Sequence, residues 1–236
     1  MNRDTKITLA HSYTGITIDQ NIVDNIFKYY KLISDEDVIK IMGREEWRFN
    51  GRNDFIQVSK VKPGQDVKKY NKILAELKEY GLMISSKMTK VRKEYFTRNI
   101  VLIQSMNTLA AELLSKLYPD EKIENADVEM FELLKLFTGT HLDIINGLKG
   151  GALFVEQISE TISKEYFHTS DKIGELVSAN IIERTNGQVK DYFGDLKDNN
   201  RNHFYKQNDS FVRQVSDYLN YAVVILSKYR VPETDK

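Results

Sequence analysis

Apolar residues recur at helical spacing along most of the chain after residue 65. This spacing predicts helices, because side chains three or four positions apart share one face of an α-helix. Asn-Gly and Gly-Gly pairs and a proline separate the apolar stretches and indicate breaks between helices. The expected helices cover residues 66–81, 86–118, 126–148, 152–184 and 209–229, with a shorter one ending at 197. Helices joined by short breaks predict antiparallel packing in a bundle, and no internal repeat is evident.

The first 65 residues follow a different pattern. Apolar spacing predicts one helix over 16–31, with Asp19 as its N-cap, and a short helix over 35–42. Aromatic and β-branched residues then flank Asn50-Gly51, a pair typical of a tight hairpin turn. The sequence therefore predicts one β-hairpin, with all strand residues confined to 45–60.

Pro63-Gly64 marks the expected end of this N-terminal part. We expect a mainly α protein made of two parts. Residues 1–65 form a small accessory module with a β-hairpin, and residues 66–236 form a helical bundle.

Composition excludes several classes of protein. Of the 236 residues, 41% are hydrophobic and 29% are charged, which is the balance of a globular protein and not of a disordered one. The absence of Cys excludes disulfides, thiol nucleophiles and Cys-based zinc sites. The four His are far apart in sequence, and no Gly-rich loop has a phosphate-binding pattern, so we expect neither a metal nor a cofactor.

No apolar run approaches the length that a membrane-spanning helix needs, and the N-terminus lacks the apolar core of a signal peptide. We therefore expect a cytoplasmic protein without a membrane partner. The net charge is zero, whereas a protein that coats nucleic acid has a basic surplus. Any contact with RNA would then depend on a local basic face.

Two polar segments in the last 75 residues contain the candidate chemistry. Residues 164–176 hold an aromatic run followed by an Asp-Lys step, and residues 196–206 hold an Arg-Asn-His run. The candidate catalytic residues are Arg201, Asn202 and His203, and the candidate substrate-binding residues are Lys206, Asp171 and Lys172.

This pair of segments resembles the larger helical members of the HEPN superfamily (higher eukaryote and prokaryote nucleotide-binding). In those proteins a helix with an aromatic run and an Asp-Lys step precedes a helix that opens with Arg-Asn and has a His nearby. The resemblance covers about residues 90–230. It implies a homodimer that binds RNA or cuts it without a metal, in prokaryotic or mobile-element defence or toxin systems.

The resemblance also implies roles for individual residues. Arg201 would hold the phosphate, because its planar guanidinium matches phosphate oxygens and stays charged. Asn202 would orient the backbone or the substrate, and a His would exchange protons with the ribose and the leaving group. The family has four to six residues between the Arg and this His, and the present chain has no His in that window. His203 is only two residues on, about 200° away around a helix axis.

Two interpretations follow. Either His203 replaces the missing His in irregular backbone, or the domain is catalytically silent and works as a helical adaptor that dimerises and docks a protein partner. A structural or regulatory phage protein is a third alternative. The simpler interpretation of each residue is structural: Arg201 and His203 on the surface, Asp171-Lys172 as an exposed step, His168 half-buried, and Tyr166 and Phe167 in the core.

Overall fold

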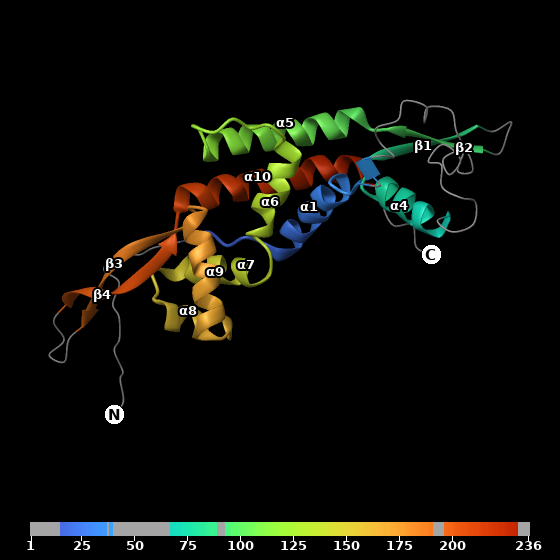
Figure 1. Ribbon diagram of the computed structural model, residues 1–236. Coiled ribbons are helices and arrows are strands. Elements are labelled where there is room, and N and C mark those ends of the chain that lie inside the picture. Colours follow the sequence, from blue (N-terminus) through green and yellow to red (C-terminus); the bar gives the residue numbers. More distant parts are fainter. Residues whose placement is uncertain (1–14, 37, 40–66, 89–92, 191–195, 231–236) are drawn as a thin grey trace. The chain divides into compact units, whose positions relative to one another are not determined.

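A computed structural model describes residues 15–36, 38–39, 67–88, 93–190 and 196–230, and within them the chain is mainly α-helical, as predicted. The helices (Figure 1) are α1 (Gln20–Ile33), α4 (Val67–Glu79), α5 (Ile100–Leu117), α6 (Ala126–Lys135), α7 (Gly139–Gly147), α8 (Val155–Ile162), α9 (Tyr166–Ser178) and α10 (Asp209–Tyr229). A short 3-10 helix, η2 (Leu148–Gly150), follows α7. The strands are β1 (Met83–Met88), β2 (Lys93–Arg98), β3 (Ile182–Lys190) and β4 (Leu196–Gln207).

Three of the expected helices are confirmed. α1, α4 and α10 lie where the apolar spacing places them, within a few residues at each end. The predicted N-cap of α1 is also present, because the Asp19 side chain accepts a hydrogen bond from the N–H of Asn21 at 2.7 Å.

The prediction that strands are confined to 45–60 is wrong. The expected helix over 86–118 begins only at Ile100, because β1 and β2 form an antiparallel hairpin before it. The expected helix over 152–184 is divided into α8, α9 and the start of β3, and β3 and β4 replace the helix expected to end at 197. Pairing between strands satisfies the backbone groups that a continuous helix would have satisfied internally.

The expected helix over 126–148 is also interrupted. α6 ends at Lys135 and α7 begins at Gly139, whose φ of 54° is a conformation that glycine adopts without strain. The predicted hairpin within 45–60 and the boundary at Pro63-Gly64 lie outside the described residues, so the two-part division at residue 65 stays a prediction.

The chain forms two compact units, each assembled from separate stretches. The first unit combines Met1–Asp24 with Leu133–Asp217, and the second combines Asn25–Glu132 with Tyr218–Lys236. The last elements of the chain therefore complete both units.

In the first unit, the Gln207 side chain joins three segments. Its amide donates to the backbone oxygens of Ile16 and Ile145, at 2.8 and 2.7 Å, and accepts from the N–H of Ile16 at 2.8 Å. Asn146 on α7 pairs in the same two-way manner with the backbone of Ile18. These side-chain amides replace the strand partner that residues 15–18 lack in this part of the fold.

In the second unit, buried tyrosines form the polar centre of an otherwise apolar core. The hydroxyls of Tyr30 and Tyr218 are 2.6 Å apart, and both rings are buried. Burial raises the pKa of Tyr29, Tyr30 and Tyr218 far above the usual range, so all three stay protonated. Phe27 stacks on Phe131 at 5.2 Å beside them.

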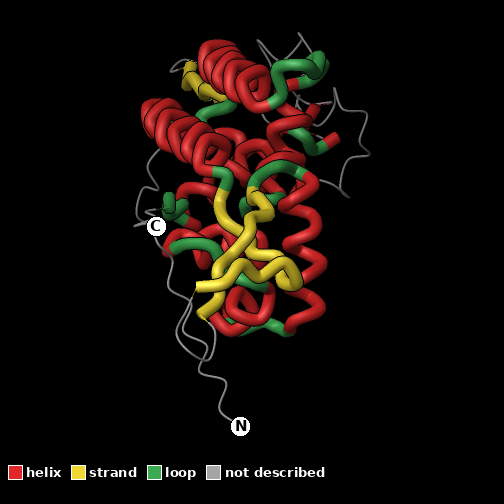
Figure 2. The backbone as a smooth tube through the Cα atoms, turned by 90° about the vertical axis from the view of Figure 1, so that its left-hand side faces the viewer, coloured by secondary structure: helices red, strands yellow, loops and turns green. Residues whose placement is uncertain are grey.

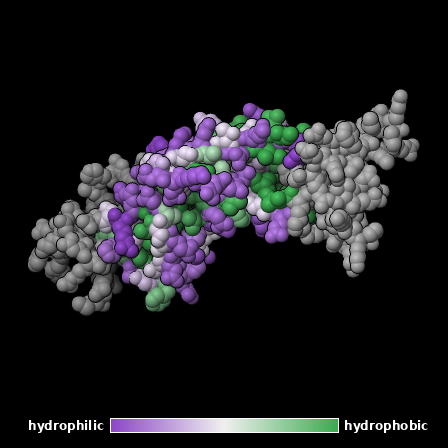
Figure 3. All heavy atoms as spheres, turned by 45° about the horizontal axis from the view of Figure 1, so that its top comes forward, coloured by the Kyte–Doolittle hydropathy of each residue, from purple (hydrophilic) through white to green (hydrophobic). Residues whose placement is uncertain are grey.

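The described surface in Figure 3 is largely hydrophilic, with smaller apolar patches. None of the described helices combines the length and apolarity needed to cross a membrane. Within the same residues, no group of three or more His, Asp or Glu is arranged to hold a metal ion.

Candidate nucleic-acid interface

α8 and α9 form a helix-turn-helix. Only residues 163–165 separate the two helices, and Ser163 ends α8 in the left-handed conformation, with φ of 55° and ψ of 48°. The N–H of Lys164 returns to the oxygen of Ser159 at 3.0 Å and closes the turn. Ile158 of α8 is buried, as are Ile173 and Leu176 of α9. A turn of this length is typical of helix-turn-helix motifs.

An antiparallel hairpin follows α9 directly. β3 and β4 pair from Ile182 with Gln207 at the base to Lys190 with Leu196 towards the tip. Leu153, just before α8, adds a third short strand position by exchanging two backbone hydrogen bonds with Tyr205, at 3.0 and 2.8 Å. Figure 2 shows the described strands in yellow, twisted as sheet strands are. The base of the hairpin is thereby attached to the start of the helix-turn-helix.

Asn208 joins the hairpin to α9 and to α10. Its backbone N–H donates to the oxygen of Ile181 at 3.0 Å, and its side-chain amide donates to the oxygen of Asn180 at 2.9 Å. Its side-chain oxygen accepts from the N–H of Phe211 at 3.3 Å and caps α10. We call α8, α9, β3 and β4 the C-terminal module.

One face of α9 is open to solvent. Phe167, Ser170, Asp171 and Gly174 follow helical spacing along it. Phe167 is 80% exposed, so the interpretation of this ring as a core aromatic is wrong. A Cβ added at Gly174 would meet no atom within 4 Å. The face therefore combines one exposed aromatic ring with small residues that allow close approach to the helix backbone.

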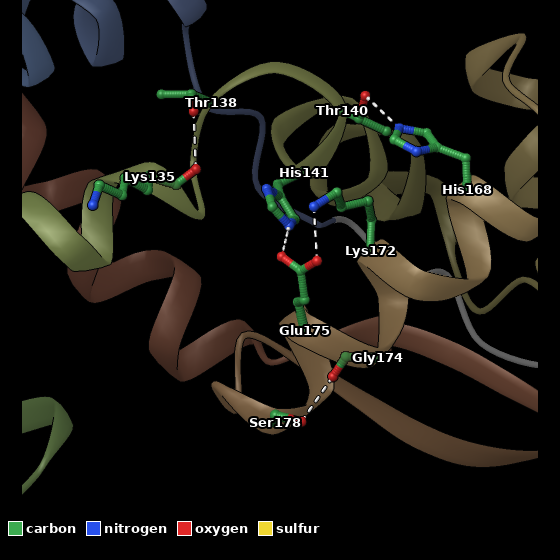
Figure 4. A network of polar contacts seen from close by, with 9 residues as sticks. All are labelled: Lys135, Thr138, Thr140, His141, His168, Lys172, Gly174, Glu175 and Ser178. Carbon is green, nitrogen blue, oxygen red and sulfur yellow. Dashed lines mark hydrogen bonds and ion pairs between the residues drawn. The ribbon is translucent and has the colours of Figure 1, made fainter.

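The adjoining face of α9 is held against α7 by a carboxylate (Figure 4). Glu175 accepts from Nε2 of His141 at 2.8 Å with one oxygen and from Nζ of Lys172 at 2.7 Å with the other. Partial burial lowers the pKa of His141, so the ring is neutral near pH 7 and its Nε2 carries the donated hydrogen. The hydrogen bond from Lys172 lowers the pKa of Glu175. His168 lies beside them, 3.4 Å from the Thr140 hydroxyl, and it is exposed where half-burial was expected.

The predicted site residues lie on two elements of this module. Arg201, Asn202, His203 and Lys206 are on β4, whereas the resembled family has its Arg-Asn at the start of a helix. Residues 200–203 oppose the single residue Asn186, because Thr185 pairs with Phe204 while Gly187 pairs with Asn199. This irregularity is a β-bulge, which bends a strand locally. His203 is exposed there, and Lys206 forms an ion pair with Glu183 at 3.2 Å.

The two predicted substrate-binding residues on α9 are placed differently. Asp171 lies on the open face, whereas Lys172 is half-buried and forms an ion pair with Glu175. Sequence reasoning missed His141 and Glu175, which are 34 positions apart and lack any local motif. It also missed the helix-turn-helix, although the buried Ile173 and Leu176 followed by Ile181 and Ile182 were available as a signal for a helix leading into a strand.

Comparison of the chain with protein-family models, with curated proteins and with solved structures found no match.

Proposed function

We propose that this protein binds double-stranded DNA, with α9 entering the major groove and the β3–β4 hairpin beside it. One observation carries the proposal: a helix-turn-helix whose second helix has an open face is followed at once by a hairpin attached to its base. This is the arrangement of a winged helix-turn-helix, in which the second helix is the one that reads the groove.

The open face of α9 has chemistry suited to base edges. Phe167 offers an apolar surface for a thymine methyl group, and Asp171 offers an acceptor for a cytosine amino group. Ser170 and Gly174 leave room for the helix to lie close to the bases. Phe167 and Ser170 belong to the first half of α9, the part that contacts bases in helix-turn-helix proteins.

The hairpin strands supply charge for the DNA backbone. β3 and β4 contain five basic residues and two acidic ones. Basic residues on a strand beside the groove hold phosphates and set the orientation of the helix without reading sequence. The bulge that contains Arg201 and His203 bends β4 within this hairpin.

The inward contacts of α9 support the same role. Glu175, His141 and Lys172 orient the helix on α7, and a reading helix must be held rigidly for its side chains to discriminate bases. The role of these three side chains is therefore to position α9 on α7.

The first test separates DNA binding from folding. Gly174→Glu places a negative charge on the open face of α9, where the added side chain meets no protein atom. Selection from a randomised duplex library gives the preferred sequence, and fluorescence anisotropy then gives the Kd. We expect the variant to lose at least about tenfold in affinity, since one base contact is worth roughly 1–3 kcal/mol.

Gly150→Glu is the matched control, because a Cβ there also meets nothing within 4 Å and Gly150 is not part of α9. It adds the same charge and should retain binding. Equal Kd values for both variants and the unchanged chain would refute the proposal, as would a failure to enrich any duplex. The same assay with RNA tests the separate predictions of a HEPN-like RNA-binding or RNA-cleaving homodimer.

A further inference from the structure

The second unit contains the same set of contacts that closes the C-terminal module. The backbone N–H of Asn99 donates to the oxygen of Leu82 at 2.9 Å, and its side-chain amide donates to the oxygen of Gly81 at 2.9 Å. Its side-chain oxygen accepts from the N–H of Leu102 at 3.2 Å and caps α5. Asn208 makes the same three bonds to Ile181, Asn180 and Phe211.

The elements around the two asparagines also correspond. α4 and α9 each contain 13 residues, and each is followed by three residues before a strand. The middle one of those three has positive φ, 69° at Gly81 and 60° at Asn180. Each hairpin then pairs its first described residue with the residue just before the asparagine: Met83 with Arg98, and Ile182 with Gln207.

Burial in the following helices has the same spacing. Leu102, Met106, Ala110 and Leu113 of α5 are buried, and so are Phe211, Val215, Leu219 and Ala222 of α10. Each of these pairs is 109 positions apart, as are Asn99 and Asn208. The expectation that the chain has no internal repeat is therefore wrong: α4, β1, β2 and α5 repeat α9, β3, β4 and α10. We call α4, β1 and β2 the N-terminal module.

The two modules differ in charge. Residues 67–98 contain nine basic and three acidic residues, whereas residues 166–207 contain six of each. Equivalent positions can also carry opposite charges. Lys72 in α4 and Asp171 in α9 occupy the same position in their helices, and the Lys72 side chain is 79% exposed. The neutral total of the chain conceals a basic surplus in one module.

We infer that the N-terminal module is a second DNA-binding surface and that it supplies most of the phosphate contacts, while α9 reads bases. This inference rests on the proposed function. Phosphate neutralisation needs a local basic surplus, which α4 has, with four Lys and two Glu, and α9 lacks, with one Lys and two acidic residues. One chain then holds two DNA-contacting helices that differ in what they read.

The test changes the charge at Lys72 and at Asp171 separately. Lys72→Asp should weaken binding to every duplex by a similar factor. It should also make the negative slope of log K against log salt shallower by about 0.9, the contribution of one phosphate contact. Asp171→Asn should instead change the preferred sequence at one or two base pairs and leave the slope unchanged. Lys122→Asp is the control for Lys72→Asp, because it makes the same charge change at an exposed residue outside both modules. Thermal melting confirms that each variant is folded.

The outcomes separate this inference from the proposed function. If Gly174→Glu abolishes binding while Lys72→Asp behaves like Lys122→Asp, α9 binds DNA and the inference is overturned. A change of preferred sequence with Lys72→Asp, and none with Asp171→Asn, also overturns the assigned roles. If the unchanged chain binds no duplex, the proposed function fails first and the inference fails with it.

Discussion

The N-terminal module and the matching part of the C-terminal module, α9, β3 and β4, have the same backbone plan and different surfaces. Asn99 and Asn208 make matching hydrogen bonds. The second residue after each of α4 and α9 has positive φ. By contrast, exposed positions of α4 and α9 carry different residues, as Lys72 and Asp171 show. The comparison teaches that capping and turn positions preserve the fold, because each has a specific backbone bond to satisfy, whereas surface positions have none.

The largest expected difference between the modules concerns their positive-φ residues. At Gly81 an added Cβ would lie 2.3 Å from the backbone oxygen of Tyr229, whereas Asn180 already has a side chain at the equivalent place. We expect Gly81→Ala to lower the free energy of unfolding by about 3 kcal/mol or more, and Asn180→Ala by about 1 kcal/mol. Urea denaturation measures both losses. Equal losses would show that contact between an added Cβ and the backbone of Tyr229 does not determine the effect at Gly81.

The base of each hairpin gives the next contrast. Gln207 satisfies three backbone groups, and Arg98 occupies the equivalent place in the other module. Gln207→Leu keeps the volume and leaves those groups without partners, so we expect a loss of about 2–3 kcal/mol in the free energy of unfolding. Arg98→Leu removes a half-buried side chain and should cost less than about 1 kcal/mol. A smaller loss for Gln207→Leu than for Arg98→Leu would be inconsistent with this account.

The asparagines themselves should behave alike. Asn99→Ala and Asn208→Ala each remove a helix cap and a hydrogen bond to a backbone oxygen, for an expected loss of about 1–2 kcal/mol. Asn99 is buried, so its loss should be the larger of the two. Asn→Asp keeps the cap and removes only the amide donor, and it should restore part of the stability. No recovery in either module would show that the cap is unimportant.

The smallest expected effect is a pH dependence from His141, the α7 residue that contacts α9 of the C-terminal module. The pKa of His141 is lowered by burial, so the unfolded chain takes up this proton first as the pH falls below about 6.5. Stability should therefore decrease from pH 7.5 to pH 5.5. The contribution of Glu175, whose pKa is also lowered, is lost only below about 4.5. His141→Gln should make the urea midpoint nearly equal at pH 7.5 and pH 5.5. A midpoint that still falls with pH as in the unchanged chain would exclude His141 as the cause.

Part of the fold was predictable from sequence for identifiable reasons. α4 and α10 follow from long apolar stripes bounded by Gly81 and by Asp209. The hairpins were missed because Tyr95 and Met88 happen to continue the helical spacing of α5, and because Asn186-Gly187 suggested a break between helices where the chain is extended. Apolar spacing in short segments does not distinguish a strand from a helix turn.

The candidate interface was less predictable. Aromatic side chains on helices are usually buried, so Phe167 was expected in the core, yet it is 80% exposed. The polar run that contains Arg201 and His203 was expected between two helices, yet pairing with β3 places it on a strand. Both outcomes depend on contacts between distant residues, which local patterns do not encode.

The bonds of Gln207 also affect the order in which the protein can mature. The partner of Ile16 is made 191 residues after Ile16 itself. At a synthesis rate of about 5–20 residues per second, the interval is roughly 10–40 s. During that time the backbone groups of Ile16 have no Gln207 to bind, and the oxygen of Ile145 lacks it while the last 62 residues of this interval are made. The first unit is therefore completed only after β4 has been made, and a nascent chain that stops before β4 exposes an unfinished edge to chaperones and proteases.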